Sequence, residues 1–199
     1  MENRLLIIFL LFVTTFFGQQ KFSTDAVVDF RKELNASFAN KDKSPLKAKD
    51  LKSFKKIDFF PVSEIFFVNA QFIRTPKEQP FEMPTSTNRK PLYVKFGEAH
   101  FVINGKKCKL NVYRNIELSN KEEYKNNLFL PFTDLTSGVE SYGGGRYVDL
   151  KIPTGDIITI DFNKAYNPYC AYSDTYSCPI PPEENNLKVA IKAGVKKFH

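Results

Sequence analysis

The sequence predicts a mainly β fold: a single antiparallel sheet, curled or closed into a barrel, with one N-terminal amphipathic helix and a long C-terminal loop closed by a disulfide. Short runs rich in Phe, Ile and Val, separated by turn residues, recur between residues 57 and 162. A helical spacing of apolar residues occurs ahead of them, in residues 23–40. Many short strands with turns between them and one leading helix favour a single sheet that is strongly curled or closed.

The composition fits one domain with a core built from phenylalanine. The chain has 199 residues, of which 42% are hydrophobic and 15% aromatic, so it can bury a sizeable core without several disulfides. The net charge of +7 raises the question of a polyanion partner. Much of the excess charge, however, comes from lysines in residues 41–56 and in the C-terminal tail, with little aromatic interleaving. We therefore expect a solvated basic face and no nucleic-acid partner.

The first 20 residues are typical of a secretory signal peptide. Arg4 is followed by an apolar run over residues 5–13 and then by a more polar end at residues 14–20. The run is shorter than the roughly 20 apolar residues of a membrane span, although an uncleaved anchor is the alternative. No cysteine lies near the junction, so a lipid anchor is not expected. Residues 21–199 are then a single β-rich domain, secreted or periplasmic, with no transmembrane anchor after cleavage.

The predicted helix at residues 23–40 precedes the clearest hairpin of the sheet. Val27, Phe30, Leu34 and Phe38 share one helical face, which we expect to pack on the sheet. Further along, Asn104-Gly105 between two strand-like runs is a strong signal for a two-residue hairpin turn. If Ile103 pairs with Lys106, strand parity places five residues on one apolar face and His100 on the other. The five are Phe101, Ile103, Cys108, Leu110 and Val112.

A second hairpin is predicted around Pro153-Thr154-Gly155, and its register carries the functional interpretation. Parity places Arg146, Val148 and Leu150 on the same face as Ile157, Thr159, Asp161 and Asn163. A loop over residues 163–186 and a short last strand at 187–191 complete the predicted β-structure of residues 57–162.

The predicted ligand site lies where this second hairpin opens. An inward-facing guanidinium needs a partner, and Asp161 is the expected partner of Arg146. The two-pronged guanidinium could instead bind a carboxylate or phosphate of a ligand. The glycine run before Arg146 lacks the spacing of a phosphate-binding loop and is expected to permit a sharp turn or close approach to a ligand. The predicted binding residues are Tyr142, Gly144, Gly145, Arg146, Asp161, Asn163, Tyr166 and Asn167.

Cys170 and Cys178 lie close together in the same C-terminal loop. In an oxidising compartment such a pair is expected to form a disulfide, stabilising the fold by roughly 2 to 3 kcal/mol. A zinc site, which needs four ligands, and free thiols are the alternatives. Cys108 is expected to be a small core residue, because parity directs it to the apolar face. No metal site and no cofactor are predicted.

Several motifs resemble one family. They are LPFTDLTSG at residues 130–138, YGGGRY at 142–147, DFNKAYNP at 161–168, Cys178-Pro179, and residues 185–194. In this order they closely resemble the uncharacterised bacterial and archaeal family known as domain of unknown function 1684, over roughly residues 25–198. Val195 departs from the glutamate of the family's Gly-Glu-Lys ending. The resemblance implies no activity and no catalytic residue.

Three functions stay open at this point. We expect an extracytoplasmic protein that binds a small polar or anionic ligand at the barrel end. The first alternative is a hydrolase with Asp161 or Glu140 as acid or base beside the tyrosines. The second is a structural or interaction protein that uses its tyrosine-rich loop. Catalytic residues, ligand identity and oligomeric state are not assigned.

Overall fold

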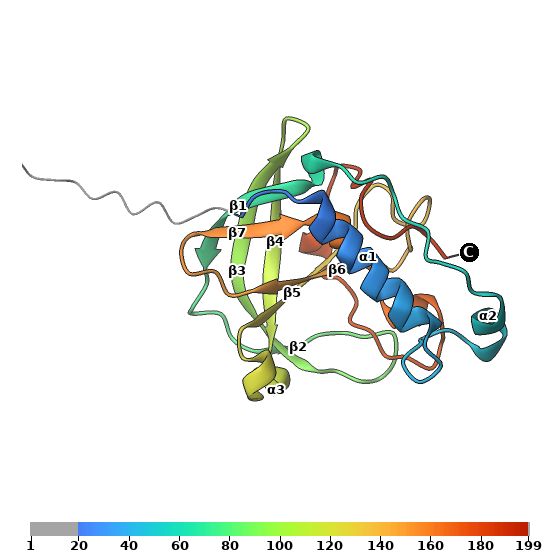
Figure 1. Ribbon diagram of the computed structural model, residues 1–199. Helices are drawn as coiled ribbons and strands as arrows, with labels where there is room; N and C mark the ends of the chain where they lie inside the picture. The colour runs from blue at the N-terminus through green and yellow to red at the C-terminus, as the bar shows by residue number, and fades with distance from the viewer. Residues whose placement is uncertain (1–19, 199) are drawn as a thin grey trace, which may run out of the picture.

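The computed structural model describes residues 20–198 and is built around a strongly curled antiparallel sheet of seven strands (Figure 1). The strand order is β6-β5-β4-β3-β1-β7, with the short β2 paired to β3. The predicted signal peptide lies almost entirely outside the described residues. Within residues 20–198, no helix is long and apolar enough to cross a membrane.

The sheet carries most of the regular structure, and the helices are few. The strands are β1 (Phe67–Arg74), β2 (Phe81–Glu82), β3 (Leu92–Ile103), β4 (Lys106–Asn115), β5 (Asn127–Phe132), β6 (Arg146–Lys151) and β7 (Ile157–Asp161). The α-helices are α1 (Thr24–Ala39), α2 (Ala48–Ser53) and α3 (Ile116–Ser119). Single 3-10 turns are η1 (Glu64–Phe66), η2 (Glu122–Tyr124), η3 (Phe162–Lys164), η4 (Tyr169–Ala171) and η5 (Glu183–Asn185).

The hairpin of β3 and β4 has the predicted register. Asn104 and Gly105 both adopt positive φ, at 50° and 74°, as a two-residue turn of this kind requires. Phe101 pairs with Cys108 and Ile103 with Lys106, so the apolar face enters the main core. Cys108 is only half-buried and packs against the edge of that core.

The prediction that β6 and β7 pair as a second hairpin is wrong. The turn around residues 153–155 does join β6 to β7, but β6 pairs with β5 while β7 pairs with β1. The two strands are therefore the opposite ends of the strand order, and the sheet is a half-barrel rather than a closed barrel. Because β6 and β7 are not paired with each other, the parity argument that linked Arg146 to Asp161 loses its basis.

The C-terminal segment fills the concave side of the half-barrel in an extended conformation. Alternate residues are buried, as in a strand, but the predicted strand at 187–191 forms no regular ladder. The backbone instead makes scattered bonds, such as Leu187 N–H to the carbonyl of Thr133 at 2.8 Å. The buried residues are Leu187, Val189, Ile191, Ala193 and Val195. This segment supplies side chains that a further strand would otherwise contribute to the core.

Helix α1 begins after Ser23, whose hydroxyl accepts a hydrogen bond from the amide of Ala26 at 3.2 Å. Val27 and Phe38 are buried, while Phe30 and Leu34 are half-buried. The ring of Phe38 contacts Tyr172 of the C-terminal loop edge to face, with centroids 4.8 Å apart. The C-terminal half of the helix thus packs on this loop through a second apolar cluster.

The predicted disulfide is not formed. Cys170 and Cys178 are free, as is Cys108, and the pair is 3.3 Å apart, against about 2.05 Å for a sulfur–sulfur bond. The loop is instead held by hydrogen bonds, including Ser86 N–H to the carbonyl of Cys178 at 2.9 Å. The loop keeps its shape without the covalent link that was expected to close it.

Candidate functional site

Arg146 is completely buried and belongs to the interior of the fold. Its Nη2 donates to Asp134 Oδ1 at 3.1 Å and to the carbonyl oxygen of Ile191 at 2.8 Å. Its Nη1 donates to the carbonyl oxygens of Ala193 and Val195. Burial lowers the pKa of the guanidinium, and the nearby Asp134 carboxylate opposes that shift. The partner of Arg146 is therefore Asp134 rather than Asp161.

Asp134 is itself fixed from several sides. Its Oδ2 accepts from the backbone N–H of Ile191 at 2.7 Å and from the hydroxyl of Thr136 at 2.9 Å. Both side chains of the ion pair have no solvent exposure. The pair thus joins the loop after β5, the start of β6 and the C-terminal segment, and both terminal nitrogens of Arg146 are bonded within the protein, whereas its buried Nε has no hydrogen-bond partner.

Asp161 and Asn163 lie together, as predicted, but Asp161 bonds Asn163, and the Asn163 side chain bonds the backbone of Ser63. Asp161 Oδ1 accepts from the amide N–H of Asn163 at 3.1 Å and from its side-chain Nδ2 at 2.9 Å. The side chain of the buried Asn163 bonds the backbone N–H and C=O of Ser63, each at 2.9 Å. This cross-link fixes η3 against the segment that enters β1.

Asn167 and the two predicted glycines also have structural contacts. Asn167 Nδ2 donates to the carbonyl of Lys196 at 2.9 Å. Gly145 has a φ of 87°, and a Cβ there would lie 2.6 Å from the carbonyl oxygen of Phe132. A Cβ on Gly144 would lie 2.5 Å from the ring of Tyr142. The close approach that these glycines permit is therefore to the protein itself.

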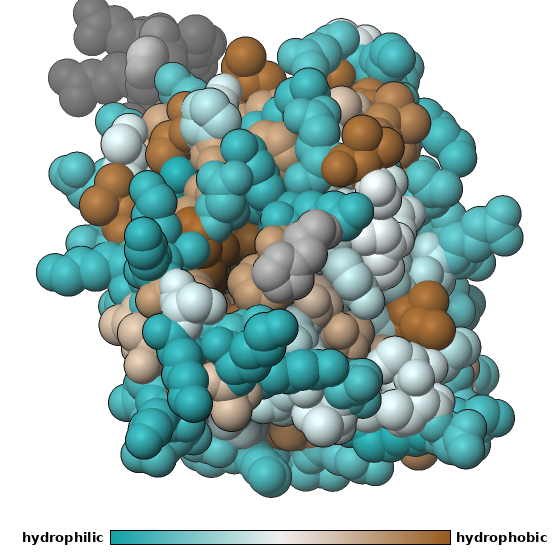
Figure 2. Space-filling view, turned by 90° about the vertical axis from the view of Figure 1, so that its right-hand side faces the viewer, coloured by the Kyte–Doolittle hydropathy of each residue, from teal (hydrophilic) through white to brown (hydrophobic). Residues whose placement is uncertain are grey.

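Two tyrosines around the C-terminal loop, Tyr147 and Tyr172, are buried. Tyr172 packs on Phe38, and Tyr147 contacts Phe129 edge to face with centroids 4.7 Å apart. Tyr169 is the more exposed member, at 39% of its surface. Figure 2 shows the face on the right of Figure 1, where apolar residues appear as separate patches among hydrophilic ones.

A cleft lies where the half-barrel fails to close, between β6 and β7, with the start of α1 at its rim. Its volume is about 860 Å³. The predicted site residues Asp161 and Tyr166 line it, whereas Arg146 and Asn163 do not. Apolar walls come from residues that also belong to the core. These wall residues are Val148, Leu150 and Ile158, joined by the half-buried Phe30 and Phe67.

Asp149 is the most distinctive polar residue of the cleft. Its Oδ2 accepts a hydrogen bond from the Tyr166 hydroxyl at 3.0 Å. The side chain is open to the cleft, yet the surrounding protein desolvates the carboxylate enough to raise its pKa. The pKa of Tyr166 is also raised, by burial and then by the Asp149 charge. Both groups therefore favour their protonated forms more than usual.

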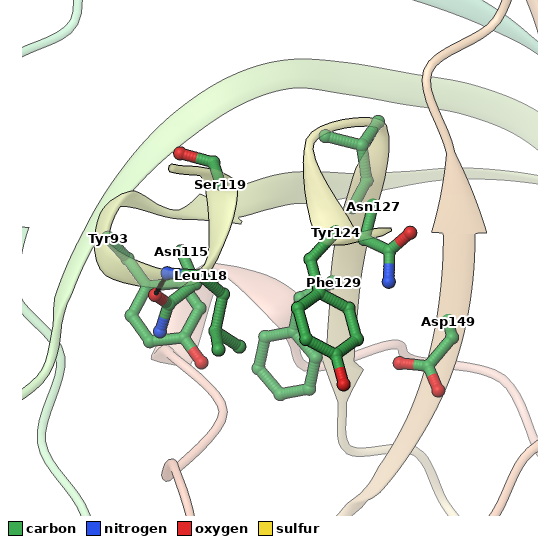
Figure 3. Close-up of a pocket in the computed structure, with 9 residues that line it drawn as sticks. Tyr93, Asn115, Leu118, Ser119, Tyr124, Asn127, Phe129 and Asp149 are labelled. Carbon is green, nitrogen blue, oxygen red and sulfur yellow. Dashed lines mark hydrogen bonds between the residues drawn. The ribbon is translucent and has the colours of Figure 1, made fainter. Parts of the chain in front are cut away.

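Asp149 also borders a second, smaller cavity of about 100 Å³ on the other side of β6 (Figure 3). The hydroxyl groups of Tyr93 and Tyr124 and the carboxylate of Asp149 face this cavity. Burial raises the pKa of Tyr93. Asp149 thus lines both this cavity and the cleft.

Asp149 is not among the binding residues that the sequence predicts. The only signal is an acidic side chain between Val148 and Leu150, which a strand places on the polar face. Glu140, which was considered as an acid or base, is exposed and bonds Lys192 at 2.9 Å, and it does not line the cleft. Among residues 20–198, no group of three or more His, Cys, Asp or Glu side chains is arranged to hold a metal ion.

Replacing Asp134 by Asn tests the structural role of the buried pair. We expect Asp134→Asn to lower the free energy of unfolding by about 3 to 5 kcal/mol, because it strands the Arg146 charge in the interior. The matched control is Glu140→Gln, which breaks an exposed ion pair and should cost less than about 1 kcal/mol. Urea unfolding measures both. Similar small losses in the two variants would contradict the assigned role of Arg146.

The raised pKa of Asp149 predicts a pH dependence of stability. A carboxyl whose pKa is higher in the folded than in the unfolded state favours folding at low pH, and this contribution is lost as pH rises through the folded-state pKa. Asp149→Asn removes the titration, so its stability relative to the parent protein should increase between pH 3 and pH 7. Urea unfolding at both pH values measures the difference. A relative stability that falls over this range would be the wrong sign.

Comparisons with known proteins identify the family and a similar fold. The sequence matches the family described as "Protein of unknown function (DUF1684)" over residues 52–196. The fold resembles the solution NMR structure of an uncharacterized protein from Haloarcula marismortui, with a TM-score of 0.67 and 34% sequence identity over 86% of this chain and 92% of that one. No curated protein matches the sequence. The match spans most of the chain, and the protein therefore belongs to the DUF1684 family.

Proposed function

We propose that the protein binds a small molecule with an apolar body and an anionic group in the cleft between β6 and β7. The observation that carries the proposal is the failure of the half-barrel to close, which leaves core side chains lining a cleft of about 860 Å³. Cavities of roughly 300 to 1,000 Å³ with mainly apolar walls and a few polar groups are typical of small-molecule sites.

Three lysines offer contacts for an anionic group on the ligand, beside the carboxyl groups of Asp149, Asp156 and Asp161 that also line the cleft. Lys21, Lys151 and Lys164 line the cleft and come from three different parts of the chain. Lys151 is held near β5 by a bond to Asn127 Oδ1. Asp149 with its raised pKa adds a group that can donate a hydrogen bond when protonated. The proposed site therefore lies in the cleft between β6 and β7, and not around Arg146 as the sequence predicted.

A charge-reversal pair tests the proposed cleft. The probe is 8-anilinonaphthalene-1-sulfonate, an aromatic anion whose fluorescence rises in apolar surroundings. We expect saturable binding to the folded protein, and Lys164→Glu should weaken it about fivefold by opposing the sulfonate. Lys188→Glu is the control, because Lys188 is exposed and outside the cleft. Equal affinities of the two variants, or no binding by the parent protein, would contradict the proposal.

Native mass spectrometry of the protein purified from its own host tests the natural ligand and the proposed export together. We propose an extracytoplasmic location from the character of the first 20 residues. The expected mass is that of a chain lacking about this segment, plus a small molecule released on unfolding. An intact N-terminus would contradict export, whereas recovery of only the ligand-free chain would count against the cleft.

A hydrolase is the second candidate, now with Asp149 as the acid or base. The bond from Tyr166 and the raised pKa of Asp149 favour this choice over Asp161, which is held by Asn163. Turnover of the retained molecule by the parent protein, with loss of turnover but not of binding in Asp149→Asn, would support an enzyme. Unchanged turnover in Asp149→Asn would exclude this role.

A further inference from the structure

Cys170 and Cys178 form a side-chain cluster that does not line the cleft. Cys170 is half-buried, whereas Cys178 has only 7% of its surface exposed. Cys178 is fixed to a neighbouring segment, since its N–H donates to Ser86 Oγ at 3.1 Å and a β-bridge pairs Thr85 with Pro179. The amide N–H of Cys170 also points at the Cys178 sulfur, at 3.2 Å. One accessible thiol thus lies directly beside a shielded one.

Hydrogen-bond donors surround the accessible sulfur. The Cys178 thiol lies 3.3 Å from it and the Tyr142 hydroxyl lies 3.8 Å from it, and either group can donate a hydrogen bond. These donors stabilise the negative charge of a thiolate, and they lower the pKa of Cys170 to about 6. The pKa of Cys178 is raised, first because its proton is used in the bond to Cys170. The pair is chemically asymmetric.

We propose that Cys170 and Cys178 form a thiol–disulfide exchange site, with Cys170 as the attacking thiolate and Cys178 as the resolving thiol. This asymmetry is what such a site requires, because the thiolate is the nucleophile and the second thiol must be within reach of the mixed disulfide. Cys108 provides the internal contrast, since burial raises its pKa and it lies on the core side of β4. The co-reactant is a small organic disulfide.

The exchange balances with that co-reactant alone. The Cys170 thiolate attacks one sulfur of the small disulfide, forming a mixed disulfide and releasing one small thiolate. The Cys178 proton passes to the released thiolate, and the Cys178 thiolate then attacks Cys170 Sγ and expels the second small thiolate. The two protein sulfurs lose two electrons, and the small disulfide gains them. In the reverse direction, the protein disulfide is reduced by two small thiols.

Trapping experiments on the reduced full protein test the assignment, with oxidised glutathione as the probe. We expect the parent protein to form the Cys170–Cys178 disulfide, leaving Cys108 to be alkylated after denaturation. Cys178→Ser should accumulate the mixed disulfide on Cys170, and Cys170→Ser should form neither product. Cys108→Ser is the control and should behave as the parent protein does. Intact mass and peptide mapping identify each species.

The pH profile of alkylation provides an independent measurement. In the native reduced protein, iodoacetamide should modify Cys170 with a midpoint near pH 6, well below the ordinary thiol value of about 8.5. Tyr142→Phe removes one donor and should slow the reaction at pH 6 by about twofold. A Cys170 midpoint at or above about 8.5 would overturn the proposal, as would a folded Cys178→Ser that takes up no glutathione.

Discussion

The buried ion pair of Arg146 and Asp134 is the interaction on which the architecture depends. A buried guanidinium needs acceptors, and here one carboxylate and the carbonyl oxygens of Ile191, Ala193 and Val195 accept bonds from its two terminal nitrogens. These acceptors belong to the C-terminal segment and to the loop after β5. The pair therefore fixes an irregular segment inside the half-barrel, where its alternate apolar side chains complete the core.

Filling the core from the C-terminal segment removes the need to close the sheet. β6 and β7 remain at opposite ends of the strand order, while Leu187, Val189 and Ile191 contribute to the core that the sheet surrounds. The opening between the two strands exposes the edge of the core and becomes the proposed cleft. The thiol pair occupies the loops at another part of the same structure, held by hydrogen bonds to the segment around Ser86. Binding and thiol chemistry are thus assigned to separate places.

Sequence reasoning succeeded where the determining interactions are local. The turn at Asn104-Gly105 set the register of β3 and β4, because positive φ at both residues and strand parity leave little freedom. The pairing of β6 with β5 could not be read in this way, since it depends on partners distant in the chain. The ion pair of Arg146 with Asp134 and the bond between Tyr166 and Asp149 could not be predicted for the same reason, because they also depend on how distant parts of the chain pack. The cysteines were correctly seen as neighbours, but proximity alone did not determine their oxidation state.

Chemical-shift mapping tests the central claim most directly, because it separates a structural Arg146 from a ligand-binding cleft in one titration. Backbone amide resonances of the protein are followed as 8-anilinonaphthalene-1-sulfonate is added. The account predicts that the largest shifts fall at residues 148–152 and 157–161 and at the start of α1, which border the cleft. Shifts concentrated instead at residues 142–146 and 134–137, with the cleft unaffected, would return the site to Arg146 and contradict the account.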